Sequence, residues 1–205
     1  MRPPRGRPHI RAMPTDHDIV TCDTRAEWRA WLARHHRQPD TIWLAYPKKG
    51  SGLGDLTYDA LVEEALCFGW IDSVARGLDE RRSMIRVSPR KARSGWSAAN
   101  KARVERLVRD GRMTPAGLAR IEAARADGSW GLLDAAESLT VPPDLAAALA
   151  ANADARRYFD AFPPGARKVI LTWITTARRP ETRARRVEET VALAARNVRA
   201  NHPRP

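Results

Sequence analysis

The stretch from Tyr58 to Val74 constrains the fold of this chain most, because a helical pattern stops at one glycine and a strand pattern follows at once. Gly69 marks the change, since glycine readily adopts the left-handed backbone that ends a helix. The next residues, Trp70–Val74, contain the aromatic and β-branched side chains that favour strands. A helix that leads directly into a strand predicts an α+β domain. The apolar stripe of the helix, with i, i+3, i+4, i+7, i+8 spacing, consists of Tyr58, Leu61, Val62, Ala65 and Leu66.

Further elements surround this helix and strand. Thr24 and Glu27 form the pattern of a capping box, which predicts a helix from there to about Arg37. Thr41–Tyr46 is short, rich in aromatic and apolar residues and bounded by a proline, which predicts a buried strand. Ser83–Val87 has the pattern of a strand that returns in a hairpin. The N-terminal part is therefore expected to hold two helices and a short antiparallel sheet.

Beyond Gly95 only helical patterns follow, which indicates a change of architecture. Thr114 and Pro115, for example, place a cap and a first-turn proline ahead of a helix. We therefore predict the α+β fold class, with a small N-terminal α+β unit and a helical C-terminal unit packed on it. The predicted boundaries are a disordered basic arm at 1–19, the α+β unit at 20–95, the helical unit at 96–200 and a tail at 201–205.

The formal net charge is +12, and the excess of basic residues is greatest toward the C-terminus. Arg156–Pro205 alone carries twelve basic against four acidic residues. Such a surface attracts polyanions, among them nucleic acid and anionic membrane surfaces. Only five of the 36 basic residues are lysine, however, and alanine is abundant, which is the coding bias of a GC-rich genome. Both explanations of the charge stay open.

The sequence also restricts where the protein acts and what it holds. No apolar run approaches the roughly 18 residues needed to span a bilayer, and the basic N-terminus lacks the apolar stretch of a secretory signal. Two cysteines, Cys22 and Cys67, are too few for a disulfide framework or a four-ligand metal site. We therefore expect a cytoplasmic protein with no membrane span, no cofactor and no bound metal; the oligomeric state is left open.

Several motifs follow one another between about Trp28 and Arg186. They are Trp43-Leu44-x-x-x-Lys48-Lys49, Ala65-Leu66-Cys67-Phe68-Gly69-Trp70-Ile71-Asp72, Ser88-Pro89-Arg90-Lys91-x-x-Ser94-x-Trp96-Ser97-x-x-Asn100, Gly111–Gly117 and Glu181–Arg186. Together these motifs resemble those of the YdeI/OmpD-associated family, also called bacteriocin-protection proteins. The resemblance implies an α+β N-terminal part, a helical C-terminal part and a role in protection against bacteriocins or envelope stress, but no reaction. Ser88 stands where the resemblance predicts a threonine.

Trp70 and Asp72 lie two residues apart on the predicted strand, so their side chains point to the same face. A carboxylate beside an indole, with cations from neighbouring loops, makes a polar pocket that suits a small anionic or aromatic ligand. The alternative is a structural ion pair that joins the hairpin to a loop. Our first hypothesis is a non-catalytic stress- or bacteriocin-protection protein that binds such a ligand. The predicted ligand-binding residues are Lys48, Lys49, Trp70, Asp72, Arg90, Trp96 and Asn100.

The run from Ser88 to Ser97 joins a strand to a helix and carries three cations and a tryptophan. Ser94 or Ser97 can cap that helix, whose free N–H groups then face the same side as the cations. The run is therefore also a candidate anion or phosphate site. An ordinary basic linker with a helix cap is the alternative.

The last predicted helix offers a basic face to a non-specific nucleic-acid binder, which is the second hypothesis. Arg183 lies one turn before Val187 of the apolar stripe. We therefore expect Arg183 to point inward and to pair with a carboxylate such as Glu181 or Asp160. The basic face consists of Arg185, Arg196 and Arg199.

An enzyme with Cys67 as nucleophile is the third hypothesis. This residue ends a predicted helix, where the negative end of the dipole raises the pKa of a thiol and disfavours the thiolate. No histidine is near it in sequence, so a small buried hydrophobe is the expected role. No metal-ligand spacing and no Ser-His-Asp pattern is present, and we expect binding rather than catalysis.

Overall fold

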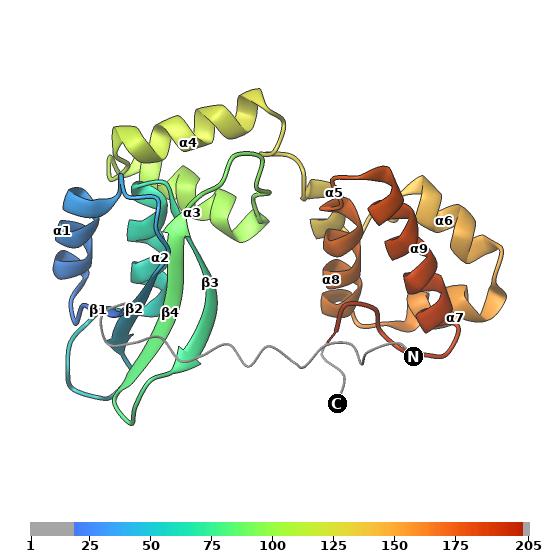
Figure 1. The fold of residues 1–205 in the computed structure, drawn as a ribbon, viewed down its shortest axis with the longest axis horizontal. Helices are drawn as coiled ribbons and strands as arrows, with labels where there is room; N and C mark the ends of the chain where they lie inside the picture. The colour runs from blue at the N-terminus through green and yellow to red at the C-terminus, as the bar shows by residue number, and fades with distance from the viewer. Residues whose placement is uncertain (1–18, 203–205) are drawn as a thin grey trace, which may run out of the picture. The chain divides into compact units, whose positions relative to one another are not determined.

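A computed structural model describes residues 19–202 of this chain (Figure 1). It contains two compact units, one made of residues up to Arg90 together with Arg112–Leu118, the other of Lys91–Gly111 and the residues from Ala119 onward. The chain thus leaves the first unit after Arg90 and returns to it once. The predicted arm, except for its last residue, and residues 203–205 of the predicted tail lie outside the described residues. Within the described range, no helix combines the length and the apolar character needed to cross a membrane.

A four-stranded sheet with the order β1-β2-β4-β3 forms the centre of the first unit. β4 pairs antiparallel with β3, which is the predicted hairpin, and antiparallel with β2 on its other side. β1 pairs in parallel with β2 and makes the sheet mixed. The α+β prediction is thus confirmed, but the sequence pattern missed β1, because three residues are too few to show alternation. The strands are β1 (Ile19–Thr21), β2 (Ile42–Pro47), β3 (Trp70–Gly77) and β4 (Arg82–Pro89).

Two helices of the first unit, α1 (Arg25–His35) and α2 (Tyr58–Cys67), begin where the sequence patterns predict. The capping box is present, since the Thr24 hydroxyl accepts from the Glu27 N–H and the Glu27 carboxylate accepts from the Thr24 N–H. Gly69 has a φ of 75°, the left-handed conformation expected after α2. Every residue from Ala60 to Trp70 is buried, so α2 is the central element of this unit.

Helices make up the second unit, and its main apolar core lies among α5 to α9 (Figure 1). Leu145, Phe159, Ile170 and Ile174 have no exposed surface there. Ser97 caps α3, since its hydroxyl accepts the Asn100 N–H at 3.3 Å, which is one of the two caps predicted for this helix. The helices are α3 (Ala98–Arg109), α4 (Pro115–Ala126, whose first turn belongs to the first unit), α5 (Asp134–Glu137), α6 (Pro143–Ala150), α7 (Ala153–Ala161), α8 (Pro164–Thr175) and α9 (Pro180–Ala194).

The returning segment Arg112–Leu118 approaches the end of α2 backbone to backbone. The N–H and the hydroxyl of Thr114 both donate to the Cys67 carbonyl, at 3.2 Å and 2.7 Å. A Cβ atom on Gly117 would lie 2.3 Å from the same carbonyl oxygen. Glycine at position 117 is therefore required by this contact.

We expect Gly117→Ala to lower the free energy of unfolding by about 1–3 kcal/mol, because the backbone around Cys67 must move to admit the methyl group. Urea denaturation measures the change. Gly165→Ala in α8 is the control, since a Cβ there meets nothing within 4 Å. That substitution should leave stability unchanged or raise it by up to about 1 kcal/mol. Equal effects at the two positions would show that the contact does not constrain residue 117.

Candidate functional site

The predicted ligand residues of the first unit are held mainly by structural contacts. Trp70 is fully buried, and its indole Nε1 donates to the His36 carbonyl at 2.9 Å. Asp72 accepts a hydrogen bond from the Tyr58 hydroxyl at 2.8 Å. Lys48 donates to the Asp79 carbonyl at 2.7 Å and thereby ties its loop to the β3–β4 turn.

Arg90 is buried despite its charge, with 4% of its surface exposed. Burial lowers the pKa of its guanidinium to about 10, and the negative charge of Asp72 opposes that shift. Arg90 therefore remains charged at neutral pH and interacts electrostatically with Asp72. Lys49 is exposed in the loop after β2.

The two predicted ligand residues Trp96 and Asn100 belong to the second unit. Trp96 is 2% exposed, and its ring packs on that of Trp130 with the centroids 5.0 Å apart. The Asn100 side-chain oxygen accepts a hydrogen bond from Arg103 at 3.2 Å. Both residues thus stabilise the start of α3, and the seven predicted residues are divided between the two units.

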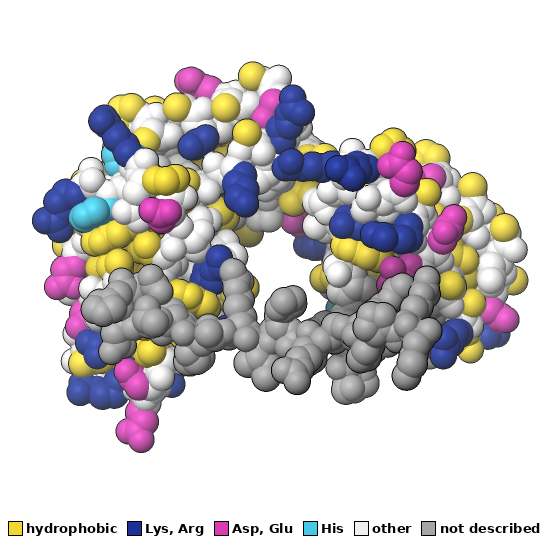
Figure 2. All heavy atoms as spheres, in the orientation of Figure 1, with side chains coloured by type: hydrophobic (Ala, Val, Ile, Leu, Met, Phe, Trp, Pro, Cys, Tyr) yellow, Lys and Arg dark blue, Asp and Glu magenta, His cyan; other side chains and the backbone are white. Residues whose placement is uncertain are grey.

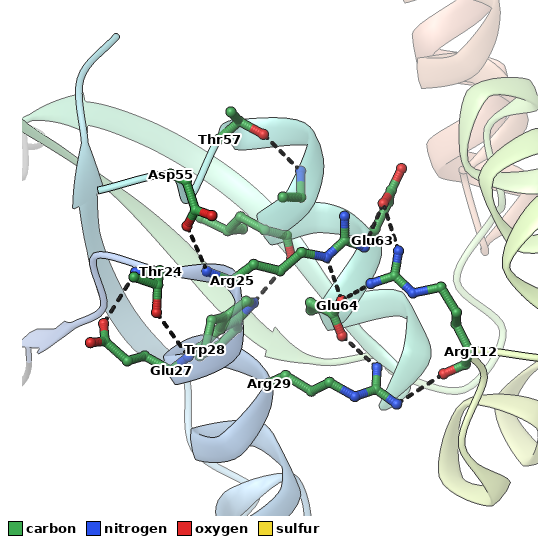
Figure 3. Close-up of polar contacts among 12 residues, drawn as sticks. Thr24, Arg25, Glu27, Trp28, Arg29, Asp55, Thr57, Glu63, Glu64 and Arg112 are labelled. Atoms are coloured by element: carbon green, nitrogen blue, oxygen red, sulfur yellow. Dashed lines mark hydrogen bonds and ion pairs between the residues drawn. The ribbon is translucent and has the colours of Figure 1, made fainter. Parts of the chain in front are cut away.

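A cluster of arginines around two acidic residues of α2 is the most highly connected polar feature of the first unit (Figure 3). Glu64 has no exposed side-chain surface and accepts hydrogen bonds from three guanidinium groups. Arg25 and Arg29 approach at 2.7 Å and 2.6 Å, and Arg112 completes the set. Glu63 accepts a second bond from Arg25 at 2.6 Å. We call these five residues the arginine–glutamate cluster.

This cluster joins three parts of the chain, since α1, α2 and the returning segment each contribute charged groups. Burial by itself lowers the pKa of Arg25, but hydrogen bonds with Glu64 and Glu63 outweigh that effect and raise it above its ordinary value. Arg29 also donates to the Arg112 carbonyl at 3.1 Å. The sequence patterns did not predict this cluster. The one feature that could have indicated it is the pair of adjacent carboxylates, Glu63 and Glu64, inside a helix that is otherwise mainly apolar.

A half-open hollow of about 610 Å³ lies in the second unit, and it includes part of the basic run predicted as an anion site. Arg93 and Arg178 bring two cations to its wall. Within the described part of the chain, Arg178 makes no ion pair with a carboxylate. We call this hollow the Arg93–Arg178 pocket. Its lining residues are Arg93, Ser94, Gly95, Asp127, Gly128, Ser129, Leu132, Thr175, Thr176, Ala177 and Arg178.

The acidic residue of the pocket is engaged by its own turn. The Asp127 carboxylate accepts the Ser129 N–H at 2.9 Å. The Ser129 side chain and N–H, followed by the Arg93 N–H and guanidinium, hold the pKa of Asp127 below its usual range. Ser129 is 5% exposed, and its hydroxyl, although near Asp127, makes no hydrogen bond of good geometry. A buried hydroxyl and two cations thus line this pocket.

Arg185, Arg196 and Arg199 are all exposed, but only Arg185 lies on α9, which ends at Ala194. Arg196 and Arg199 follow in the segment beyond the helix, so the prediction of one basic helical face was wrong. Arg183 is partly buried as predicted, but its partner is Asp144, at 2.6 Å and 2.9 Å, so the expectation of Glu181 or Asp160 was wrong. Asp144 precedes it by 39 residues, and only the packing of α6 on α9 brings the two together. On the face drawn in Figure 2, basic side chains lie on both units with acidic ones among them, so charge alone does not single out a site.

Both cysteines are free thiols and are buried. Burial, followed by nearby Glu27 and Asp23, raises the pKa of the Cys22 thiol to about 11. Burial and the charge of Glu64 also raise the pKa of Cys67, against a smaller opposing effect of Arg29. Among residues 19–202, no group of three or more His, Cys, Asp or Glu side chains is arranged to hold a metal ion.

The fold defines an α+β protein with a helical second unit, and two family models match different parts of the chain. Residues 20–120 match the family described as a domain of unknown function (DUF8412). Residues 138–197 match the family described as "Bacteriocin-protection, YdeI or OmpD-Associated". The predicted resemblance is therefore confirmed over this part of the chain, which includes Glu181–Arg186 but none of the earlier motifs. No curated protein and no solved structure matches the chain.

We expect Glu64→Gln to lower the free energy of unfolding by about 3 kcal/mol, because it removes the buried charge around which three guanidinium groups are arranged. Urea denaturation monitored by circular dichroism measures this loss. Glu105→Gln on the exposed side of α3 is the control and should change stability by less than about 0.5 kcal/mol. A Glu64 variant as stable as the control would contradict a stabilising role for the cluster.

The raised thiol pKa values predict a protein whose stability falls at alkaline pH. The folded state retains a proton on Cys22 up to about pH 11, whereas an unfolded thiol loses it near pH 8.5. The stabilisation is therefore complete below about pH 8.5 and is lost as the pH rises toward 11. In Cys22→Ala, the free energy of unfolding should depend less on pH over this window.

A thiol reagent at about pH 8 should label neither cysteine until the protein unfolds. Rapid labelling of Cys67 in the native protein would favour the enzyme hypothesis.

Proposed function

We propose that this protein acts by binding rather than catalysis, and that the Arg93–Arg178 pocket takes a small anionic ligand in a bacteriocin-protection-type role. The match of residues 138–197 to the bacteriocin-protection family points to that role. The free, buried thiols Cys22 and Cys67 support a reducing compartment, and we place the protein in the cytoplasm.

The observation that carries the proposal is the convergence of two cations and a buried hydroxyl on one hollow. Arg93 belongs to the basic run, Ser129 to the turn after α4, and Arg178 to the loop between α8 and α9. Asp127 brings one negative charge against the two positive charges of Arg93 and Arg178, so a net positive charge remains at the pocket. A planar guanidinium binds carboxylate and phosphate oxygens well, so a ligand with such a group fits the lining.

The pocket suits a ligand larger than a simple ion. Its volume of about 610 Å³ lies within the range of typical small-molecule sites. Leu132 and Ala177 add apolar surface, and Thr175 and Thr176 add hydroxyl groups. An anionic group held by the arginines could therefore be accompanied by a small polar body, as in a phosphorylated or carboxylated metabolite.

Thermal unfolding in the presence of inorganic phosphate, pyrophosphate and a panel of phosphorylated sugars and carboxylic acids tests the proposal. A compound present at about 100 times its Kd adds about 2.7 kcal/mol to the stability of the folded state. For a chain of this size such an increase raises Tm by roughly 5–10 °C. We expect at least one compound to do so, and we expect Arg178→Ala to abolish the shift.

Arg179→Ala is the matched control, because Arg179 is the next residue, is exposed and does not line the pocket. Phosphate stabilises folded proteins in general, so the decisive quantity is the difference between the two variants. Equal shifts in Arg178→Ala and Arg179→Ala, or no shift across the panel, would overturn the proposal.

A further inference from the structure

A second cationic surface lies on the sheet of the first unit, on the face turned away from α1 and α2. Trp43 of β2 stands directly opposite Arg86 of β4. Arg76 of β3 stands opposite Met84, two residues before Arg86. Opposed residues of antiparallel strands share a face, as do residues two apart on one strand. Trp43, Arg76 and Arg86 therefore lie on one side of the sheet, across three neighbouring strands.

The other side of the sheet carries the contacts with the helices. Trp70 packs edge-on against Trp31 of α1, with the ring centroids 5.8 Å apart. Asp72 accepts the hydrogen bond of Tyr58 at the start of α2. Trp70 stands opposite Pro89, and Asp72 stands opposite Val87. Because Pro89 and Val87 are each an odd number of residues from Arg86, they point away from the side that carries the arginines.

The two arginines are arranged around the tryptophan ring. The guanidinium carbon of Arg76 lies 5.3 Å from the centre of the Trp43 ring, and that of Arg86 lies 6.0 Å from it. All three side chains are partly exposed. Cation–π attraction at these distances keeps both guanidinium groups beside the indole. We call Trp43, Arg76 and Arg86 the cationic sheet face.

The positive charge of this face has no acidic counterpart in the described part of the chain. Over residues 19–202, no ion pair joins Arg76 or Arg86 to a carboxylate. This distinguishes them from four arginines of the same unit that form ion pairs with carboxylates. Those paired arginines are Arg25, Arg29, Arg82 and Arg112, which bind Glu63, Glu64 or Asp23.

We propose that the cationic sheet face binds single-stranded nucleic acid. Its two guanidinium groups attract phosphates. A guanidinium that turns from the Trp43 ring to a phosphate leaves the indole face open, and an unpaired base can then stack on it. Guanidinium planes also stack on bases, so the same arginines serve both contacts. A duplex buries its base faces in its own stack and offers this surface only its backbone, which is why the single strand fits better.

This surface is independent of the Arg93–Arg178 pocket, because the two share no residue and belong to different units. It also differs from the basic face of Arg185, Arg196 and Arg199, which lacks an aromatic side chain. The failure of either proposal would therefore leave the other intact.

Fluorescence anisotropy of the full chain with labelled oligo(dT) and oligo(U) of about 15 nucleotides tests the proposal. We expect Arg76→Ala combined with Arg86→Ala to weaken binding at least about 10-fold at low salt. The slope of log affinity against log salt should fall by about 1.4, or about 0.7 for each phosphate that the variant no longer neutralises. The two oligonucleotides differ in the sugar and in the 5-methyl group of the base, and a preference for either agrees with the proposal.

The matched control is Arg185→Ala combined with Arg196→Ala, which removes the same charge from the second unit. We expect this pair to weaken binding less than about 3-fold, which corresponds to general attraction alone. Equal losses in the two pairs would overturn the proposal, as would a larger loss in the control pair. So would the absence of binding, or a duplex of the same length that binds as tightly as the single strand.

The stacking contact is tested by Trp43→Leu, which should weaken binding on the order of 10-fold without changing the salt slope. Circular dichroism and Tm show whether this variant folds. Should it unfold, Trp43→Phe retains a smaller ring and should produce an intermediate loss. Unchanged affinity in a folded Trp43 variant would exclude base stacking at this face and overturn the proposal.

Discussion

Glu64 is the residue on which the first unit depends, because its buried carboxylate is held by arginines from two other parts of the chain. An isolated carboxylate in this position would carry a large desolvation penalty. Three charge-assisted hydrogen bonds offset it, and they also fix α1 and the returning segment against α2. The close approach of Gly117 to Cys67 reinforces the same junction. The helical layer behind the sheet is thus organised by one charged group and one glycine.

The arginines of this chain serve different purposes, and their partners distinguish them. Those of the arginine–glutamate cluster are matched to carboxylates and stabilise the fold. Arg90 is buried near Asp72 and keeps its charge although burial lowers its pKa. Arg178 and the pair on the cationic sheet face have no acidic partner among the described residues, and they lie beside a hollow or an aromatic ring. A high net charge therefore does not by itself locate function.

Local patterns predicted the elements of the fold well. The capping box at Thr24 and the turn at Gly69 both depend on neighbouring residues, and each is present. β1 was missed because its three residues carry too little pattern. The wrong partner for Arg183 has a similar origin, since Asp144 is 39 residues away and proximity in sequence favoured nearer acids. Trp70 was predicted to bind a ligand but is fully buried. Alternation along a strand shows which side chains share a face of the sheet, but it does not show which of the two faces the helices cover.

By itself the sequence determined the α+β class, the starts of α1 and α2, the turn at Gly69, the strands of the antiparallel pairs and the burial expected for Cys67. These properties depend on interactions within a few residues, where backbone geometry sets which side chains meet. The tertiary structure alone decided which charges are paired, which basic residues border the Arg93–Arg178 pocket and which side of the sheet carries Trp43 with its two arginines. Those outcomes depend on residues tens of positions apart, as with Glu64 and Arg112, whose separation is 48 residues. Only the packing of whole elements brings such groups within hydrogen-bond distance.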